Sequence, residues 1–374
     1  MATPYIWHPG SRSVNGQWPF HLDLWPDELL SSWLIRLALV HRCDPMSLTG
    51  SIWPNWRVWQ HDPDRYIPDE LVNILSSKAG VNCESIKAAF LSNISNKCLG
   101  GRPLSKGVYP WIMANGNRGR RHNFGRAVCP KCLLESPYLK IQWRLAWHTV
   151  CAQHETLLVD RCSFCQKLIQ PHRLEGKDRK IATCSFCKSS LAFYLGDFRS
   201  LPTSVIDLQM MLDDVLLKGA GIYNGRKINA EAFFNIVRFF VSLIRIASLE
   251  KNQPLRHSLL HVGVAEEVLL PTKFGLRIEL SAISDRLSIW RGVNTLLSLA
   301  PRDLFNSFHK YSMTSSIRFL NSVPIPPPFE SLAERALKRK HLNKRPPTTS
   351  ANKRPKTKKV VMQKWHRLIN RSSR

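Results

Sequence analysis

The sequence predicts a mainly α-helical protein with little β structure, in which zinc-binding modules separate two helical regions. Three observations lead to this prediction. Apolar residues recur at helical spacing in several segments before residue 100 and after residue 200. Between them, seven cysteines and one histidine have the spacing of metal ligands. From Arg335 to Arg374 the chain is dense in lysine and arginine and contains no acidic residue, which is typical of a disordered tail.

The region 21–125, which follows an N-terminal extension over 1–20, is predicted to be a helix-turn-helix bundle with a basic loop. Its first helix is expected from Trp25 to His41, because Pro26 and two acidic residues precede an apolar stripe. Further helices are expected to begin at Asp44, Ile67 and Asn82. Three apolar residues of the helix after Ile67 are expected to face inward: Leu71, Ile74 and Leu75. This pattern suits DNA binding, although helical bundles without DNA contacts are commoner.

The potential metal ligands form two blocks with one spacing, so that each ligand of the first block has a counterpart at a constant interval in the second. The first block is Cys129, Cys132, Cys151 and His154, and the second is Cys162, Cys165, Cys184 and Cys187. Two residues between ligands let one tight turn direct both side chains at one ion. Four protein ligands leave no open position, so the sequence predicts tandem zinc fingers over 126–198 with two structural zinc ions. His148 is a competing ligand, but His154 matches Cys187 in the repeat, and His172 is expected in a surface loop.

After the zinc fingers, residues 199–322 are predicted to form an α-helical domain. Helices are expected over 201–218 and 230–249, and a further apolar stripe begins at Ile283 and ends before Pro301. The 230–249 segment is apolar on most sides and is expected to be central. Residues 323–374 are predicted to be a Pro-rich linker and a basic disordered tail.

The chain shows no enzyme signature, so no catalytic residue is expected. Glycines near residue 220 lack the Lys-Ser/Thr of a phosphate-binding loop. A nucleobase deaminase is excluded because no His-x-Glu precedes a Pro-Cys-x-x-Cys. Four aspartates are expected to be structural: Asp62, Asp64, Asp213 and Asp214.

The net charge of +27 favours a polyanionic partner, and the positive charge is concentrated in two segments. One is the tail; the other is an acid-free stretch of nine basic residues between Ser85 and Leu134, which includes the loop from Gly116 to Gly125. Lysines and arginines bind DNA phosphates by releasing counterions. The candidate DNA contacts are Arg102, Lys106, Arg118, Arg120, Arg121, Arg126, Lys353, Arg354, Lys356, Lys358 and Lys359. A merely solvated basic loop and a solubilising tail are the alternatives.

The most apolar stretch, Phe233 to Ala247, is interrupted by Arg238 and Arg245, and the segment from Met1 to Phe20 lacks the apolar run of a signal peptide. A soluble, cytoplasmic, nucleoid-associated protein without a membrane partner is therefore expected.

Two parts of the sequence together resemble the TniQ/TnsD family of transposon target-selection proteins. The first is Pro-Asp-Glu-Leu-Leu-Ser-Ser-Trp-Leu-Ile-Arg-Leu-Ala from Pro26 to Ala38. The second is the zinc block from Cys129 through Trp143-Arg144-Leu145 to Cys165, with weaker support from Arg286 and Trp290. The resemblance implies a helix-turn-helix domain, tandem zinc fingers and a helical C-terminal part.

The resemblance also implies a non-enzymatic adaptor that connects a DNA target to an AAA+ ATPase, which recruits a DDE transposase. It leaves a homodimer open. The leading hypothesis is direct reading of target DNA, because the basic loop and tail depart from the better-known family members. The alternatives are a mainly protein-binding adaptor that docks on an RNA-guided CRISPR effector complex, and a zinc-containing transcriptional regulator.

Overall fold

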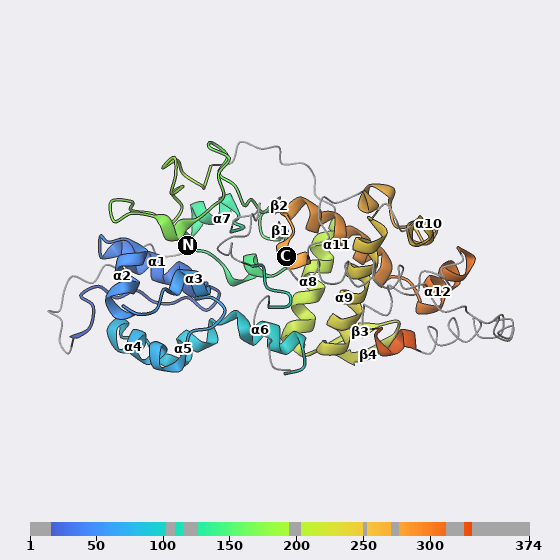
Figure 1. The fold of residues 1–374 in the computed structure, drawn as a ribbon, viewed down its shortest axis with the longest axis horizontal. Helices are drawn as coiled ribbons and strands as arrows, with labels where there is room; N and C mark the ends of the chain where they lie inside the picture. Colours follow the sequence, from blue (N-terminus) through green and yellow to red (C-terminus); the bar gives the residue numbers. More distant parts are fainter. Residues whose placement is uncertain are drawn as a thin grey trace, which may run out of the picture. The chain divides into compact units, whose positions relative to one another are not determined.

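The computed structural model describes residues 16–101, 109–114, 126–193, 203–249, 253–270, 277–311 and 325–330 (Figure 1). In these ranges the chain is mainly α-helical, and its strands form two short antiparallel pairs. The mainly helical fold class predicted from the sequence is therefore confirmed. The helix-turn-helix arrangement and the domain boundaries stay predictions. No helix within the described ranges is long and apolar enough to cross a membrane.

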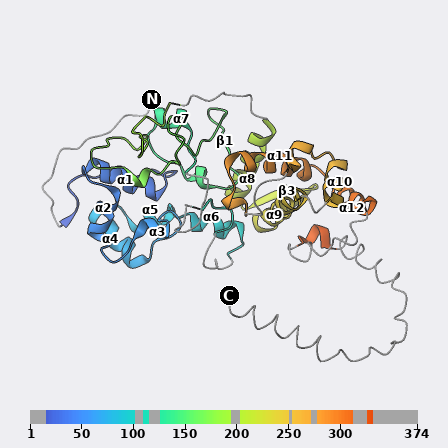
Figure 2. The same cartoon turned by 45° about the horizontal axis from the view of Figure 1, so that its top comes forward.

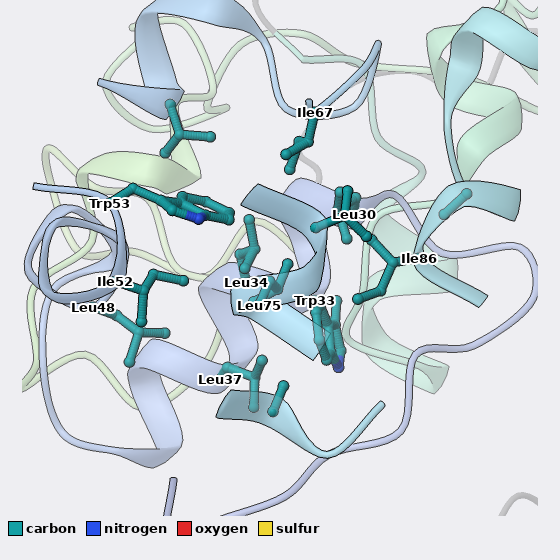
Figure 3. Packing of buried hydrophobic residues seen from close by; sticks show 14 of the residues in the cluster. Leu30, Trp33, Leu34, Leu37, Leu48, Ile52, Trp53, Ile67, Leu75 and Ile86 are labelled. Carbon is teal, nitrogen blue, oxygen red and sulfur yellow. The ribbon is translucent and has the colours of Figure 1, made fainter. Parts of the chain in front are cut away.

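Six helices come first along the chain; side chains from the first five line the N-terminal core, whereas the sixth packs against the C-terminal helices. They are α1 Leu30–Val40, α2 Pro45–Ile52, α3 Val58–His61, α4 Asp69–Ala79, α5 Cys83–Ala88 and α6 Leu91–Cys98. Helix α1 lies at the centre, since Leu30, Trp33 and Leu34 are fully buried (Figure 3). Side chains from the surrounding elements pack against it, among them Leu48, Ile52, Trp53, Ile67, Leu75 and Ile86 (Figure 3). The apolar stripe that predicted this helix is thus the middle of the core.

Two details of the N-terminal core differ from the predictions. Helix α1 begins at Leu30 instead of Trp25, and Glu28 is fully buried just before it. The Glu28 carboxylate accepts a hydrogen bond from Ser32 Oγ at 2.7 Å and forms an ion pair with Arg36. Because both partners belong to α1, these buried contacts stabilise the start of the helix. In α4, Leu75 faces inward as expected, but Ile74 is 40% exposed and Val72 is fully buried in its place.

The middle of the chain contains mostly short elements. They are α7 Pro130–Glu135, β1 Val150–Cys151, β2 Thr156–Leu157, and the 3₁₀ helices η2 Ile141–Arg144 and η3 Pro171–Arg173. Strands β1 and β2 pair antiparallel, with Cys151 opposite Thr156. Helix η3 packs on the N-terminal core, where the His172 ring stacks on Trp59 with centroids 5.8 Å apart. His172 is therefore a half-buried packing residue and not the surface residue expected, and burial together with the Arg126 and Arg173 charges lowers its pKa to about 4.

The segment after η3 lies so close to the N-terminal core that only glycine fits at position 176. The Gly176 N–H donates to Asp44 Oδ1 at 3.0 Å, and a Cβ at this position would overlap the Arg42 carbonyl group. We expect Gly176→Ala to lower the free energy of unfolding by about 1–3 kcal/mol, as overpacking does elsewhere. Urea denaturation followed by tryptophan fluorescence measures the loss. Gly50→Ala is the matched control, because nothing lies within 4 Å of its Cβ; equal stability of the two variants would contradict the prediction.

The C-terminal helices enclose a second apolar core. The helices are α8 Thr203–Lys218, α9 Ala230–Ala247, α10 Gln253–His261, α11 Ile283–Leu297 and α12 Pro301–Lys310. Strands β3 Ala220–Tyr223 and β4 Arg226–Asn229 form a hairpin between α8 and α9. Two 3₁₀ helices, η4 Glu266–Leu269 and η5 Ile278–Leu280, lie between α10 and α11. Helices α8, α9 and α11 pack against one another (Figure 2). Most of the side chains of α9 are buried, which confirms its predicted central position. The hairpin was not predicted; its turn is Asn224-Gly225, both with positive φ.

Candidate metal centres

The four ligands predicted for the first zinc ion come together in the structure. Cys129 and Cys132 lie at the start of α7, Cys151 lies on β1, and His154 follows in the turn to β2. All four ligand atoms lie within 4.8 Å of one another. The His154 Nδ1 atom is 3.3 Å from Cys132 Sγ and 3.5 Å from Cys151 Sγ. Tetrahedral zinc with Zn–S bonds of about 2.3 Å requires ligand separations of roughly 3.7 Å or slightly less, so these residues fit a zinc ion.

The second cluster joins two turns of identical sequence, Cys-Ser-Phe-Cys. Cys162 Sγ is 3.6 Å from Cys187 Sγ, and Cys165 Sγ is 3.7 Å from Cys184 Sγ. These separations exceed a disulfide bond of about 2 Å and match the edges of a zinc tetrahedron. The residue after each turn, Gln166 or Lys188, has a left-handed φ near 60° and closes the turn by donating its N–H to the carbonyl of the first cysteine. The internal repeat found in the sequence is therefore also a structural repeat.

Neither cluster includes His148, the competing ligand of the first block. The His148 Nε2 atom instead lies 2.9 Å from Asp213 Oδ1, and Trp147 Nε1 donates to the same oxygen at 2.7 Å. His148 thus packs beside Trp147 and links the segment before Cys151 to helix α8.

A carboxylate outside the first cluster orients its histidine. His154 Nε2 lies 2.8 Å from Glu135 Oε1, at the end of α7, and Gln153 Nε2 donates to the other Glu135 oxygen at 3.0 Å. A carboxylate on the second ring nitrogen of a ligating histidine fixes the ring and keeps the nitrogen that faces the metal unprotonated.

We expect Glu135→Gln to weaken zinc binding at the first cluster about 10-fold or more, because such outer partners contribute that much elsewhere. The rate and midpoint of zinc transfer to a coloured chelator measure the effect. Glu155→Gln is the matched control, since this exposed glutamate is next to His154 but forms no hydrogen bond with a cluster ligand in the part of the chain that the structure describes. Identical zinc transfer from both variants would show that Glu135 does not support the ligand.

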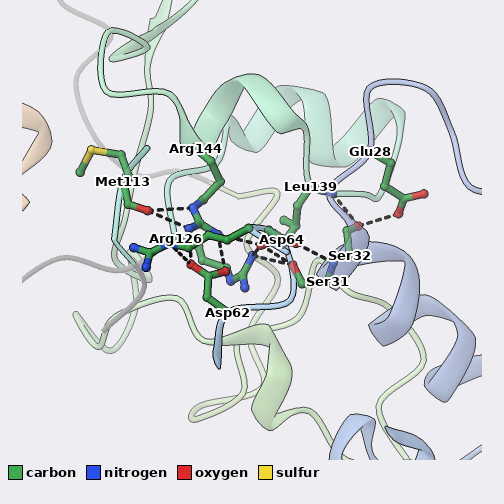
Figure 4. A network of polar contacts seen from close by, with 10 residues as sticks. Glu28, Ser31, Ser32, Asp62, Asp64, Met113, Arg126, Leu139 and Arg144 are labelled. Carbon is green, nitrogen blue, oxygen red and sulfur yellow. Dashed lines mark hydrogen bonds and ion pairs between the residues drawn. The ribbon is translucent and has the colours of Figure 1, made fainter. Parts of the chain in front are cut away.

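A buried network of charges connects the N-terminal core to the segment before Cys151 (Figure 4). Arg144 donates to Asp62 Oδ2 and to Asp64 Oδ2, each at 2.7 Å, and its guanidinium also donates to the Met113 carbonyl. Asp64 is fully buried and accepts a hydrogen bond at 2.7 Å from the Ser31 N–H of α1. The network therefore joins the start of α1 to η2, which leads into the first metal-ligand cluster.

Arg126 belongs to this network, which corrects its place among the candidate DNA contacts. Its side chain is 8% exposed, and its NH1 group donates to Asp64 Oδ2 at 3.0 Å and to Ser31 Oγ at 2.7 Å. A guanidinium held inside the protein in this way does not reach a phosphate. The other candidate DNA contacts lie outside the described residues: Arg102, Lys106, Arg118, Arg120, Arg121, Lys353, Arg354, Lys356, Lys358 and Lys359.

The network makes the fold sensitive to acid through Asp62. Burial by itself raises the pKa of Asp62, but the charge of Arg144 and its hydrogen bonds outweigh burial and hold the pKa below its usual value. A carboxyl whose pKa is lower in the folded state stabilises the fold above about pH 4 and stops doing so as the pH falls through the lowered pKa. We expect the urea midpoint of the native chain to fall below pH 4 more steeply than that of Asp62→Asn. Parallel curves for the two chains would contradict this role.

The C-terminal helices also hold the segment before Cys151. The buried Arg286 of α11 donates to the carbonyls of Ala146 and His148 at 3.0 and 2.9 Å, and Trp290 Nε1 donates to Ala146 at 3.0 Å. The residues that gave weaker support to the family resemblance are thus those that anchor the chain just before Cys151.

Part of the chain matches a known protein family. Residues 19–158 match the family model described as TniQ, and no curated protein matches the chain. The matched range contains the N-terminal core, the buried charge network and all four ligands of the first cluster, and it ends before Cys162.

Proposed function

Since the chain belongs to the TniQ family through residues 19–158, we propose that it is a DNA-binding target-selection protein of a transposon. In this role it links target DNA to an AAA+ ATPase and, through it, to a DDE transposase. The family match is the observation that carries the proposal, because a TniQ domain implies a target-selection adaptor associated with transposition. The ATPase, the transposase and a homodimeric form belong to the proposal.

The metal clusters support a structural role for zinc in this adaptor. Each cluster gathers four protein ligands, which fill the coordination sphere of a tetrahedral zinc and leave no position for a reacting water. The contacts of Arg144 and Arg286 fix the segment that leads to Cys151 of the first cluster, Arg144 to the N-terminal core and Arg286 to helix α11. We propose that two zinc ions hold this middle region rigid and that the chain is not an enzyme.

The charge of the chain supports direct contact with DNA. The net charge is +27, and it is concentrated in the Gly116–Gly125 loop, its neighbours and the tail. We propose that these segments neutralise DNA phosphates and that the N-terminal helices supply any sequence preference. Neutralising several phosphates makes binding steeply dependent on salt, because each contact releases bound counterions.

A salt titration with the full-length chain tests this proposal. Affinity for a labelled DNA duplex is expected to fall by two or more orders of magnitude between about 50 and 200 mM salt. Replacing Arg120 and Arg121 by alanine should weaken binding to all sequences and reduce the salt slope. Replacing Arg226 and Lys227, two exposed cations of strand β4, removes the same charge and is the control. Salt-independent binding, or equal affinity of the two double variants, would remove the loop from the DNA contact.

A mainly protein-binding adaptor is the second candidate, and exposed apolar residues of the C-terminal region favour it. Leu217 of α8 and Ile222 of β3 are 83% and 72% exposed, and Met210 of α8 is 57% exposed. Such side chains suit contact with another protein. Stable binding to an RNA-guided effector complex, lost on replacing Leu217 and Ile222 by serine and combined with no affinity for free DNA, would favour this candidate over direct DNA reading.

A further inference from the structure

Three exposed phenylalanines surround the second metal cluster. Phe164 and Phe186 occupy the same position in the two Cys-Ser-Phe-Cys turns and are 52% and 38% exposed. Their neighbours Cys165 and Cys187 hold ligand atoms within 4.8 Å of each other, so the two turns lie side by side. Phe193, 65% exposed, lies beside the first turn, because its carbonyl accepts a hydrogen bond from Ser163 Oγ at 3.3 Å. We call Phe164, Phe186 and Phe193 the aromatic surface.

Cations stand next to this surface. The Lys167 Nζ atom lies 4.7 Å from the centroid of the Phe186 ring, and the Arg173 guanidinium carbon lies 5.9 Å from it. Both side chains are exposed, as are Arg179 and Lys180. None of these four cations forms an ion pair with an acidic residue of the described part of the chain, whereas Lys177 and Lys188 are paired with Glu175 and Asp178. The module therefore offers unneutralised positive charge beside exposed rings.

The aromatic surface is not the side by which the module packs on the rest of the chain. That packing is made through His172 on Trp59 and through Gly176 on Arg42 and Asp44. The rings stand instead on turns that are closed by the hydrogen bonds of Gln166 and Lys188. A ligand that stacks on them meets groups whose backbone is already fixed, so little conformational entropy is lost on binding.

We propose that the aromatic surface binds unpaired bases of a single-stranded nucleic acid. Exposed aromatic rings next to free cations are the combination that single-stranded sites use, since each ring stacks on a base while the cations contact the adjoining phosphates. In a duplex the faces of the bases are covered by their neighbours, so the rings have no base to stack on. The inference deepens the proposed function and rests on it only in taking DNA as the strand that is bound.

Equilibrium binding of the zinc-loaded, full-length chain to two fluorescent probes tests the inference. One probe is an oligothymidylate of about 20 nucleotides and the other is a duplex of equal length. Replacing Phe164 and Phe186 together by alanine is expected to weaken binding of the single strand at least about tenfold, because stacking contributes that much per base. Affinity for the duplex is expected to stay within about twofold, since phosphate contacts remain.

Two further variants separate stacking from damage to the fold. Replacing both phenylalanines by tyrosine keeps aromatic faces and is expected to retain single-strand affinity. Leu134→Ala truncates a side chain of α7, next to the first cluster, that is 71% exposed. It is expected to change neither the single-strand nor the duplex affinity. Zinc content measured on each variant must equal that of the native chain, which shows that the second cluster is intact.

The possible outcomes distinguish this inference from the proposed function. Unchanged single-strand affinity in the alanine variant overturns the inference and leaves duplex binding in place. A native chain that binds the duplex but not the single strand does the same. A native chain that binds the single strand through the phenylalanines, with no affinity for the duplex, supports the inference and contradicts target reading on duplex DNA. A native chain that binds neither probe overturns both.

Discussion

Removal of zinc from the purified chain is expected to unfold the segment 159–193 and to expose the cysteines of both clusters. The module around the second cluster has only about 35 residues, fewer than the roughly 40 below which domains usually need a metal or disulfides. Its buried aliphatic side chains are few: Ile169, Leu174, Ile181 and Leu191. A structural zinc in a module of this kind contributes on the order of 10 kcal/mol to folding.

The expected native state contains two zinc ions per chain, measured by atomic emission on protein purified without added metal. Chelation should release both ions, make all seven cluster cysteines reactive towards a thiol reagent, and open the region between the two helical parts to protease. The N-terminal core should stay folded and keep Trp33 and Trp53 shielded from a fluorescence quencher, because both pack in an apolar cluster of their own.

Single substitutions sharpen this prediction. Cys162→Ser should leave one ion, held by the first cluster, and Cys151→Ser should leave one ion, held by the second. Cys43→Ser is the matched control, since Cys43 is half-buried near the Ala38 carbonyl and belongs to neither cluster; it should retain both ions. A native chain with one ion or none, or one that keeps its protease resistance after chelation, would contradict the assignment of two structural zinc sites.

The grouping of the eight cysteine and histidine side chains was predictable because metal ligation leaves a pattern that one sequence can show. A tight turn between paired ligands requires a short, fixed spacing in the sequence. The same spacing occurs twice, with Cys129 matching Cys162 and His154 matching Cys187, and such a repeat rarely arises by chance. Helices α1, α4 and α9 were predicted for a similar reason. When one face of a helix is buried, apolar residues recur along the sequence at the spacing of the helical turn. Local patterns of this kind do not depend on what the rest of the chain does.

The errors arose where the role of a residue is decided by a contact or an exposure that no periodic pattern shows. Arg126 lies in an acid-free basic stretch, which indicates phosphate contacts, but its partner Asp64 is far away in the sequence. Glu28 resembles an acid in the first turn of a helix until its pairing with Arg36 and its burial are known. The β3–β4 hairpin was missed although Asn224-Gly225 is a hairpin signal, because β4 is largely exposed and lacks the alternating apolar pattern of a half-buried strand.

Loss of the Asp64 charge is expected to be among the most damaging single changes in the TniQ domain. Asp64 is fully buried, and its carboxylate receives hydrogen bonds from Arg126, Arg144 and Ser31. In Asp64→Asn the two guanidinium groups stay buried, and Asp62 is left as the carboxylate beside them, paired with Arg144 but not with Arg126. Breaking a buried pair in this way costs about 3–5 kcal/mol, because the remaining charge has lost both water and partner. Urea denaturation at neutral pH, followed by tryptophan fluorescence, should show a loss of this size.

Asp64→Asn is expected to affect zinc release as well as stability, because Asp64 contacts several parts of the fold. Its partners come from α1, from the segment just before the first cluster and from η2, so the substitution loosens the contact between the N-terminal core and the first cluster. We therefore expect Asp64→Asn to release zinc from the first cluster faster than the native chain does, with the second ion retained. Asp69→Asn is the control, since Asp69 pairs with Lys87 at 3.1 Å on the surface and should affect neither stability nor zinc release. Native zinc kinetics in Asp64→Asn, together with native stability, would show that the network does not couple the two parts.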